Sequence, residues 1–275
     1  MRNVFAILLA LGLSFSLLAQ EPDNLSSGNL VAWCIVPFDA KKRGPAQRAA
    51  MLKELGITRC AYDWRKEHVR QFEEEIQAYQ KQGIEFFAFW GGHEEAFRLF
   101  EKYDLQPQVW RTLKSPKEES QEEKVEVAAQ AMKELAQSTQ AIGCKLGLYN
   151  HGGWGGEPAN LVAVCLRLRE MGFAHVGIVY NWHHGHGRIA SWAEDLALMQ
   201  PYLHCLNLNG MNDDADPKIL ALGQGAHEQE MLQVVIESGY RGPIGILDHQ
   251  KELDSKIALQ ANLDGLAVLK AKVGK

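Results

Sequence analysis

The chain has 275 residues, of which 29 are basic and 34 acidic, so its formal net charge is −5. A mildly acidic chain lacks the basic surface of a nucleic-acid-binding protein, and this length is enough for one domain with a full hydrophobic core. The cysteines are odd in number and have no close pairs, which argues against a disulfide framework: Cys34, Cys60, Cys144, Cys165 and Cys205.

The first twenty residues have the pattern of a secretory signal peptide. Arg2 precedes an uncharged apolar run from Val4 to Leu18, and Ala19-Gln20 lead into the polar segment EPDNLSSG. The run is short for a transmembrane span. We expect residues 1–20 to be removed, residues 21–275 to form the mature domain, and the protein to be periplasmic or secreted, without membrane contact after cleavage. An uncleaved membrane anchor is the alternative.

Eight short segments rich in apolar and β-branched residues follow, and helical segments lie between them. The expected strands are residues 29–39, 57–64, 84–92, 107–113, 144–153, 175–184, 202–211 and 243–250. Each strand with its helix takes about thirty residues, as a parallel crossover unit requires. Eight such units predict an α/β fold, a single-domain (β/α)8 TIM barrel; a doubly wound open sheet is the weaker alternative.

The helical segments carry ordinary start and stop signals. Residues 44–56, 69–83, 157–172 and 227–239 each end on a glycine, the residue that best fits the left-handed position after a last helical turn. The fourth helix opens with Ser120-Gln121-Glu122-Glu123, the pattern of a capping box.

In a TIM barrel, functional side chains lie at the carboxyl ends of the strands. Strand alternation places Asn207 and Asn209 on one face with Cys205, and we expect both amides to point into the barrel mouth. By the same alternation Tyr149 and His151 share a face with Gly147. Asp248 shares a face with Ile244 and Ile246.

The tryptophans also collect near the strand ends. Trp33 and Trp110 lie within strands, and we interpret them as barrel packing. For the others at or beyond strand ends we expect a binding role: Trp64, Trp90, Trp154 and Trp182. Flat aromatic rings beside amides and imidazoles suit a hydroxyl-rich ring, so the predicted partner is a small sugar or cyclitol.

The chain resembles a known protein family in the segments LYNHGG (148–153), NWHH (181–184), LNLNGM (206–211), GILDHQ (245–250) and LGQGAHEQEMLQVVIESGYRGPIGI (222–246). This is the xylose isomerase-like TIM-barrel family, which includes sugar phosphate isomerases and epimerases. The resemblance is clearest over residues 144–270. It implies a metal tetrad of Glu, Asp, His and Glu, and the matching positions here are Tyr149, Asn181, Asn207 and Asp248.

Three of those four positions have lost a strong ligand. One carboxylate with two amides is a poor site for Mg²⁺ or Mn²⁺. A divalent metal such as Zn²⁺ or Mn²⁺ is left open as an alternative, through His151, His184 or His186 with Asp248, since imidazole suits zinc. We expect hydrogen-bonding histidines and no firmly bound cofactor.

The leading hypothesis is an exported sugar-active enzyme, an isomerase, epimerase or lyase that abstracts a proton next to a carbonyl. His151, His184 and Asp248 are the predicted catalytic residues, because an imidazole or a carboxylate can serve as the base. The predicted substrate-binding residues are Trp64, Trp90, Tyr149, Trp154, Asn181, Trp182, His183, His186, Asn207 and Asn209.

Within the segment NWHHGHG, Asn181 and His184 are expected to face the pocket, Trp182 and His183 to shape the neighbouring wall, and His186 to lie further out. The alternative to an enzyme is a non-catalytic carbohydrate-binding barrel that has lost the metal site. A neutral sugar is the expected ligand, because the only phosphate partners that the sequence suggests are Arg43, Arg111 and Arg188. Endonuclease-like cleavage would need several metals and a basic groove, and we exclude it.

Overall fold

The computed structural model describes residues 24–273. Eight parallel strands close into a barrel in sequence order, because β1 pairs with both β2 and β8. The strands are β1 (Leu30–Trp33), β2 (Arg59–Tyr62), β3 (Glu85–Trp90), β4 (Gln108–Thr112), β5 (Leu146–Tyr149), β6 (Val176–Asn181), β7 (Leu203–Leu208) and β8 (Ile244–Leu247). The predicted (β/α)8 barrel is confirmed, and the open sheet is excluded.

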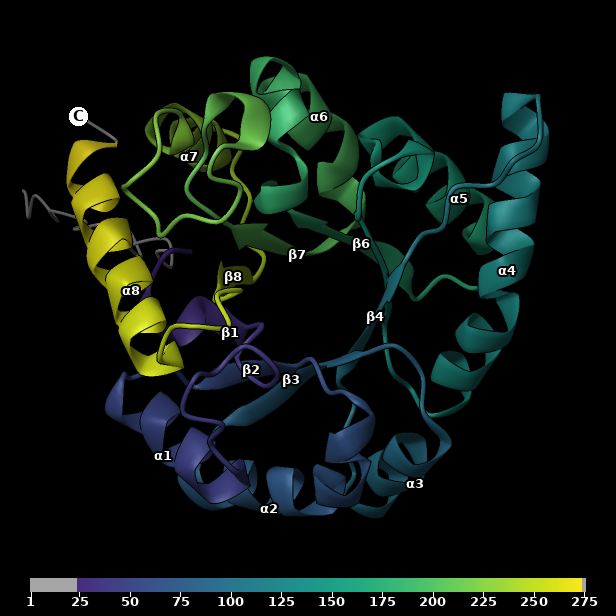
Figure 1. Ribbon diagram of the computed structural model, residues 1–275. Helices are drawn as coiled ribbons and strands as arrows, with labels where there is room; N and C mark the ends of the chain where they lie inside the picture. Colours follow the sequence, from purple (N-terminus) through teal and green to yellow (C-terminus); the bar gives the residue numbers. More distant parts are fainter. Residues whose placement is uncertain (1–23, 274–275) are drawn as a thin grey trace, which may run out of the picture.

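The helices form a ring around the strands (Figure 1). They are α1 (Pro45–Glu54), α2 (Phe72–Gln82), α3 (Glu94–Lys102), α4 (Gln121–Ala141), α5 (Pro158–Glu170), α6 (Trp192–Met199), α7 (Glu228–Glu237) and α8 (Ser255–Lys272). Within residues 24–273, no helix combines the length and apolar character needed to cross a membrane. The proposed signal peptide lies outside the described residues.

Local sequence signals account for several boundaries. Gly83 has a φ of +69° and ends α2 in the left-handed conformation. Ser120 caps α4, since its Oγ accepts the backbone N–H of Glu123 at 3.2 Å. The strands are shorter than expected because the polar residues at their carboxyl ends do not continue the hydrogen-bonded pairing between strands. At the end of β1, for example, Cys34 has a φ of +61°, which breaks the extended backbone after Trp33.

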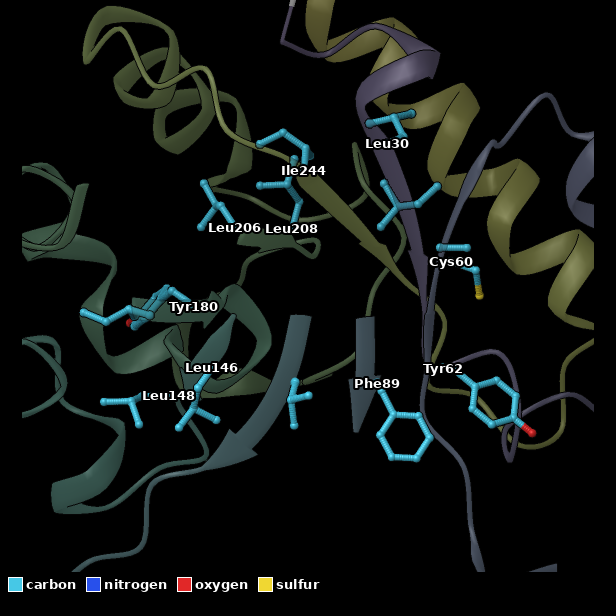
Figure 2. Close-up of a cluster of buried hydrophobic side chains, with 14 of the residues drawn as sticks. Leu30, Cys60, Tyr62, Phe89, Leu146, Leu148, Tyr180, Leu206, Leu208 and Ile244 are labelled. Carbon is cyan, nitrogen blue, oxygen red and sulfur yellow. The ribbon is translucent and has the colours of Figure 1, made fainter. Parts of the chain in front are cut away.

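Two apolar layers result from strand alternation. Side chains that face the helices form the larger cluster, to which Leu206, Leu208 and Ile244 contribute (Figure 2). Side chains that face inward fill the barrel, and they include Trp33, Trp110, Tyr149 and Cys205. The two tryptophans pack edge to face with ring centroids 4.9 Å apart, so side chains fill the barrel interior below its mouth.

Small residues make this packing fit. A Cβ on Gly147 would lie 2.5 Å from Cγ2 of Val179 and 3.1 Å from the Trp110 ring. A Cβ on Gly245 would lie 1.7 Å from Oδ1 of Asn207. Glycine on β5 and β8 therefore leaves the interior room that the large neighbouring side chains occupy.

Candidate active site at the barrel mouth

A pocket with a volume of about 190 Å³ opens at the carboxyl ends of the strands. Its lining consists of Trp33, Cys34, Phe38, Asp63, Arg65, Trp90, Tyr149, His151, His183, His184 and His249. These residues come from the ends of β1, β2, β3, β5, β6 and β8 or from the loops that follow. The pocket is therefore where the fold class predicts chemistry.

Aromatic rings form the inner wall of this pocket. Trp90 meets Tyr149 edge to face with ring centroids 5.0 Å apart, and Trp33 lies 5.5 Å from Trp90. Rings of this kind present flat apolar surface to a ligand, and the polar groups of the pocket are arranged beside them.

The hydroxyl of Tyr149 is held by two donors. It accepts Nε1–H of Trp33 at 3.3 Å and Nδ2–H of Asn181 at 2.6 Å. Its own proton has no acceptor within residues 24–273, so it is available to a ligand. Burial raises the pKa of Tyr149 far above its ordinary value, so this group is a hydrogen-bond donor at every physiological pH.

Four histidines surround the opening. The ring centroids of His183 and His184 are 3.6 Å apart, those of His151 and His184 are 4.3 Å apart, and those of His183 and His249 are 5.5 Å apart. Burial, followed by the charge of neighbouring groups, strongly lowers the pKa values of His183 and His184. Burial also lowers the pKa of His249, to about 4. These three imidazoles are therefore neutral at neutral pH.

A lysine from the loop between β7 and α7 contacts His184. Nζ of Lys218 lies 3.4 Å from Nδ1 of His184. An ammonium group can only donate, so Nδ1 is the acceptor and the ring proton is on Nε2. His184 in this tautomer offers an N–H donor.

Asp63 is the one carboxylate of the lining, and it is buried. Its Oδ1 accepts the backbone N–H of Val36 at 3.2 Å, and its Oδ2 has no partner within the described residues. Burial raises the pKa of Asp63 to about 7. A buried carboxyl group that titrates near neutral pH, with one oxygen that has no hydrogen-bond partner, is suited to acid–base catalysis.

Residues 39–270 match the family described as xylose isomerase-like TIM barrel. The chain belongs to this family. The family resemblance seen in the sequence is thus confirmed, although no curated protein matches the chain.

Several solved structures share the fold. They include 3-keto-D-glucoside 4-epimerase from E. coli (TM-score 0.66, 13% identity, 89% of this chain and 99% of that chain). The IOLI protein with a bound zinc atom is similar (TM-score 0.68, 13% identity, 89% and 98% covered). So is D-psicose 3-epimerase with D-tagatose from Clostridium cellulolyticum H10 (TM-score 0.63, 10% identity, 88% and 98% covered). Identities this low establish the common fold alone.

The residues at the positions of the metal tetrad of xylose isomerase-like barrels do not suit a metal. Tyr149 and Asn181 bond to each other at 2.6 Å, so the amide N–H group of Asn181 faces the phenol oxygen. Asn207 is enclosed beside Gly245, and Asp248 accepts the Ser255 hydroxyl at 2.6 Å. Among residues 24–273, no cluster of three His, Cys, Asp or Glu side chains has the geometry of a metal site.

We expect protein purified without added metal to hold less than about one tightly bound divalent ion per chain, because amides and a phenol are poor ligands for hard cations. Elemental analysis after dialysis against a chelator measures this. Stoichiometric zinc or manganese that survives the dialysis would contradict it.

The structure brings together five of the residues predicted for this xylose isomerase-like site. Trp90, Tyr149, His151, His183 and His184 all line the pocket. The sequence places His183 in the neighbouring wall, but its buried ring is part of the pocket lining and lies against His184 at an interplanar angle of 43°. Asn181 does not line the pocket but fixes the Tyr149 hydroxyl, as described above.

Three predicted tryptophans lie outside the pocket lining. Nε1 of Trp64 donates to the carbonyl of Trp90 at 2.7 Å. Nε1 of Trp154 donates to Oε1 of Gln121 at 2.8 Å. Trp182 is fully buried and packs edge to face on Trp192. The indole rings of all three pack against the hydrophobic core, so they stabilise the walls and loops of the barrel.

Three polar residues predicted to bind substrate also serve the scaffold. Asn207 does face the barrel interior, as the alternation indicated, and accepts the Cys205 thiol at 3.5 Å. Nδ2 of Asn209 donates to the carbonyls of Gly210 and Lys218. The ring nitrogens of His186 lie 2.8 Å and 3.0 Å from the carbonyls of Asn212 and Lys218. None of the three lines the pocket.

Asp248 requires a correction, because it does not face the pocket. It does share a face with Ile244 and Ile246, but both isoleucines belong to the layer that faces the helices. Asp248 accordingly points toward the start of α8, where Ser255 Oγ donates to it. The residue of this loop that lines the pocket is His249.

The sequence interpretation passed over Asp63, Arg65 and His249 as site residues. Asp63 could have been found from alternation, because Ala61 is small and faces inward while Tyr62 faces the helices. His249 follows Leu247 on the inward face in the same way. For Arg65 the sequence gives no comparable signal, since it lies in a loop.

A larger hollow of about 890 Å³ lies between α3 and α4, outside the barrel wall. Its walls include Phe97, Met132 and Leu135, with Arg111 at the strand end. None of the residues predicted to be catalytic or to bind substrate contributes to it, so it is separate from the pocket at the mouth.

Proposed function

We propose that the protein is a sugar isomerase or epimerase that moves a proton next to a carbonyl group without a metal ion. The observation that carries this proposal is the pairing of fixed donors with a free carboxylate oxygen in one small pocket. Tyr149 O–H and His184 Nε2–H are the donors, and Asp63 Oδ2 is the acceptor.

In the proposed step a base removes the proton from the carbon next to the carbonyl. The electrons of the C–H bond form a carbon–carbon double bond, and the carbonyl oxygen becomes an enolate oxygen. Tyr149 and His184 stabilise that charge with hydrogen bonds, as preorganised donors do in oxyanion holes. This replaces the stabilisation that a metal would give at the same positions.

Asp63 and His151 are the two candidate bases. Asp63 follows β2 and His151 follows β5, and two strands of the ring separate β2 from β5. A base on each side of the substrate permits inversion: one removes the proton, and the protonated form of the other returns a proton to the opposite face. The raised pKa of Asp63 suits this work at neutral pH.

The sugar as substrate class has two supports. Aromatic rings line the pocket beside polar donors, and two proteins of the same fold are a 3-keto-D-glucoside epimerase and a D-psicose epimerase with D-tagatose. The pocket of about 190 Å³ also limits the ligand to a small molecule.

Deuterium incorporation tests the proposal. The protein is incubated in D₂O with ketoses, keto-uronates and ketose phosphates, and exchange at the carbon next to the carbonyl is followed by NMR. We expect exchange with at least one sugar, and loss of exchange in His184→Ala but not in His227→Ala, whose histidine contacts Asp213 away from the pocket. A sugar that quenches tryptophan fluorescence but never exchanges would favour the binding-only barrel.

Replacing Asp63 with asparagine separates catalysis from stability. The folded-state pKa of about 7 exceeds the value of about 4 in an unfolded chain. The folded state therefore binds more protons between these pH values, and stability falls as the pH rises through that window. Asparagine carries no charge and its oxygen can still accept the Val36 N–H.

Asp63→Asn should therefore melt at a higher temperature than the wild type at pH 8, with the gain shrinking as the pH falls to 5, and it should lose most of its exchange activity. Calorimetry at several pH values and the D₂O assay measure the two effects. Equal melting temperatures at pH 8 together with full activity would remove Asp63 from the mechanism.

We also propose that the protein is exported. The support is the signal-like pattern of residues 1–20. After expression of the full chain, N-terminal sequencing should give a start near Gln20 or Glu21 in the soluble exported fraction. Met1 retained in a membrane fraction would contradict this.

A further inference from the structure

Arg65 lines the pocket and Lys218 contacts the lining residue His184, and neither cation forms an ion pair with an acidic side chain of the described residues. Within residues 24–273, no carboxylate oxygen lies within 4.0 Å of the charged nitrogens of Arg65 or Lys218. Two arginines considered earlier as anion partners are neutralised by the protein itself: Arg43 pairs with Asp39 and Asp254, and Arg188 pairs with Asp195 and Glu157.

Arg65 is held so that part of its guanidinium group stays free. Nη1 donates to the carbonyls of Asp63 and Trp64 at 2.7 and 2.9 Å, and the group lies 5.6 Å from the ring centroid of Phe38. Nε and Nη2 donate to no atom in the described part of the chain. Arginine has five N–H donors, so the donors on these two nitrogens remain for a ligand in the pocket that Arg65 lines.

The loop that carries Lys218 is fixed by two residues predicted to bind substrate. His186 Nε2 and Asn209 Nδ2 both contact the Lys218 carbonyl, at 3.0 and 2.9 Å. The Lys218 ammonium lies at His184, where it has a ring nitrogen as acceptor but no charge partner. His186 and Asn209 thus hold the backbone segment from which the Lys218 side chain extends.

The charge near the two cations is not balanced from other elements either. Asp63 is the only acid in the lining, Asp39 is paired with Arg43, and Asp248 is turned toward Ser255. The buried histidines carry no charge at neutral pH, and the positive charge of Lys218 contributes to keeping their pKa values low. When Asp63 is ionised it offsets one of the two positive charges, since the charge of Arg65 acts on it, so a neutral ligand would still leave one positive charge in excess.

We propose that the substrate carries an anionic group, a carboxylate or a phosphate, which binds between Arg65 and Lys218. This inference rests on the proposed function for the rest of the substrate, and it replaces the neutral sugar expected from the sequence. Guanidinium and ammonium groups are the usual partners of both kinds of anion.

Three ketoses that differ only at C6 test this inference: D-fructose, D-fructuronate and D-fructose 6-phosphate. Binding is measured by calorimetry and by tryptophan fluorescence at low and at physiological salt. At least one anion should bind about tenfold or more tightly than fructose, and salt should weaken its binding. Which anion binds better tells a carboxylate site from a phosphate site.

Variants locate the effect. Lys218→Gln should lose about tenfold in affinity for the preferred anion and nothing for fructose, while Lys218→Arg should keep most of it. Arg65→Gln should do the same, and a melting curve shows whether that variant is folded. Lys133→Gln, an exposed lysine on α4, is the matched control with unchanged binding.

The inference is overturned if fructose binds as tightly as both anions, if neither anion binds, or if Lys218→Gln leaves anion binding unchanged. These results are distinct from a failure of the proposed function. Anion binding without deuterium exchange would reject the proposed chemistry alone. Exchange of fructose together with exchange of both anionic ketoses that is no more efficient than that of fructose and is indifferent to Lys218→Gln would reject this inference alone.

Discussion

Replacing Tyr149 with phenylalanine should slow deuterium exchange by about 10²–10³-fold, the usual cost of removing one donor from an oxyanion site. The substitution removes one oxygen and its proton and keeps the ring that packs against Trp90. The donors on Trp33 and Asn181 also lose their acceptor, so a stability loss on the order of 1–3 kcal/mol should accompany the kinetic effect.

Tyr180→Phe is the matched control. The Tyr180 hydroxyl is buried on the helix side of β6 and has no partner within the described residues, so its removal leaves the pocket unchanged. The control should exchange deuterium at the wild-type rate. If Tyr149→Phe does so too, Tyr149 is only a packing residue and the enolate must be stabilised by other groups.

Arg48→Met should destabilise the barrel by about 3–5 kcal/mol, the usual cost of breaking a buried ion pair. Nη1 of Arg48 on α1 lies 2.5 Å from Oε2 of Glu75 on α2, and both side chains are almost completely buried. Nη2 of Arg48 also donates to the carbonyl of Arg43. Without the arginine, Glu75 is a buried charge with no partner. Urea unfolding measures the loss.

Two further variants test the reason for this loss. The double substitution Arg48→Met with Glu75→Leu should recover most of it, because apolar residues of similar volume often replace a buried pair without cost. Arg98→Met, which breaks an exposed pair with Glu95, should change stability little. A double variant as unstable as the single one would show that shape, and not charge, is what Arg48 contributes.

The barrel itself could be predicted because its signals are local and repeated. Eight apolar segments, the glycines that end helices and the Ser120 cap each specify their own neighbourhood, and all of them agree on parallel crossover units. The carboxyl ends of the strands are harder to predict, since they depend on where hydrogen bonding to the neighbouring strands stops. Cys34, with its positive φ, shows how abruptly that happens.

The sequence predicts where the site lies, at the barrel mouth, but only some of the residues that form it. Alternation correctly grouped Asp248 with Ile244 and Ile246, but it could not say which face of β8 points inward. That choice depends on neighbouring strands, where Asn207 occupies the space over Gly245. Asp63 and His249 lie two residues after the inward-facing Ala61 and Leu247, so alternation identifies them once the inward face is known. Arg65 and Lys218 reach the site through loops whose course no periodic pattern specifies.

In the proposed mechanism, fixed hydrogen-bond donors take the place of the metal that the family resemblance implies. The direct measurement is deuterium exchange into the best ketose by wild-type protein that has been dialysed exhaustively against a chelator and analysed for metals. We predict that exchange persists at the same rate in metal-free protein and is not increased by added Mn²⁺, Mg²⁺ or Zn²⁺. Exchange that disappears on chelation and returns with one of these ions would contradict the claim.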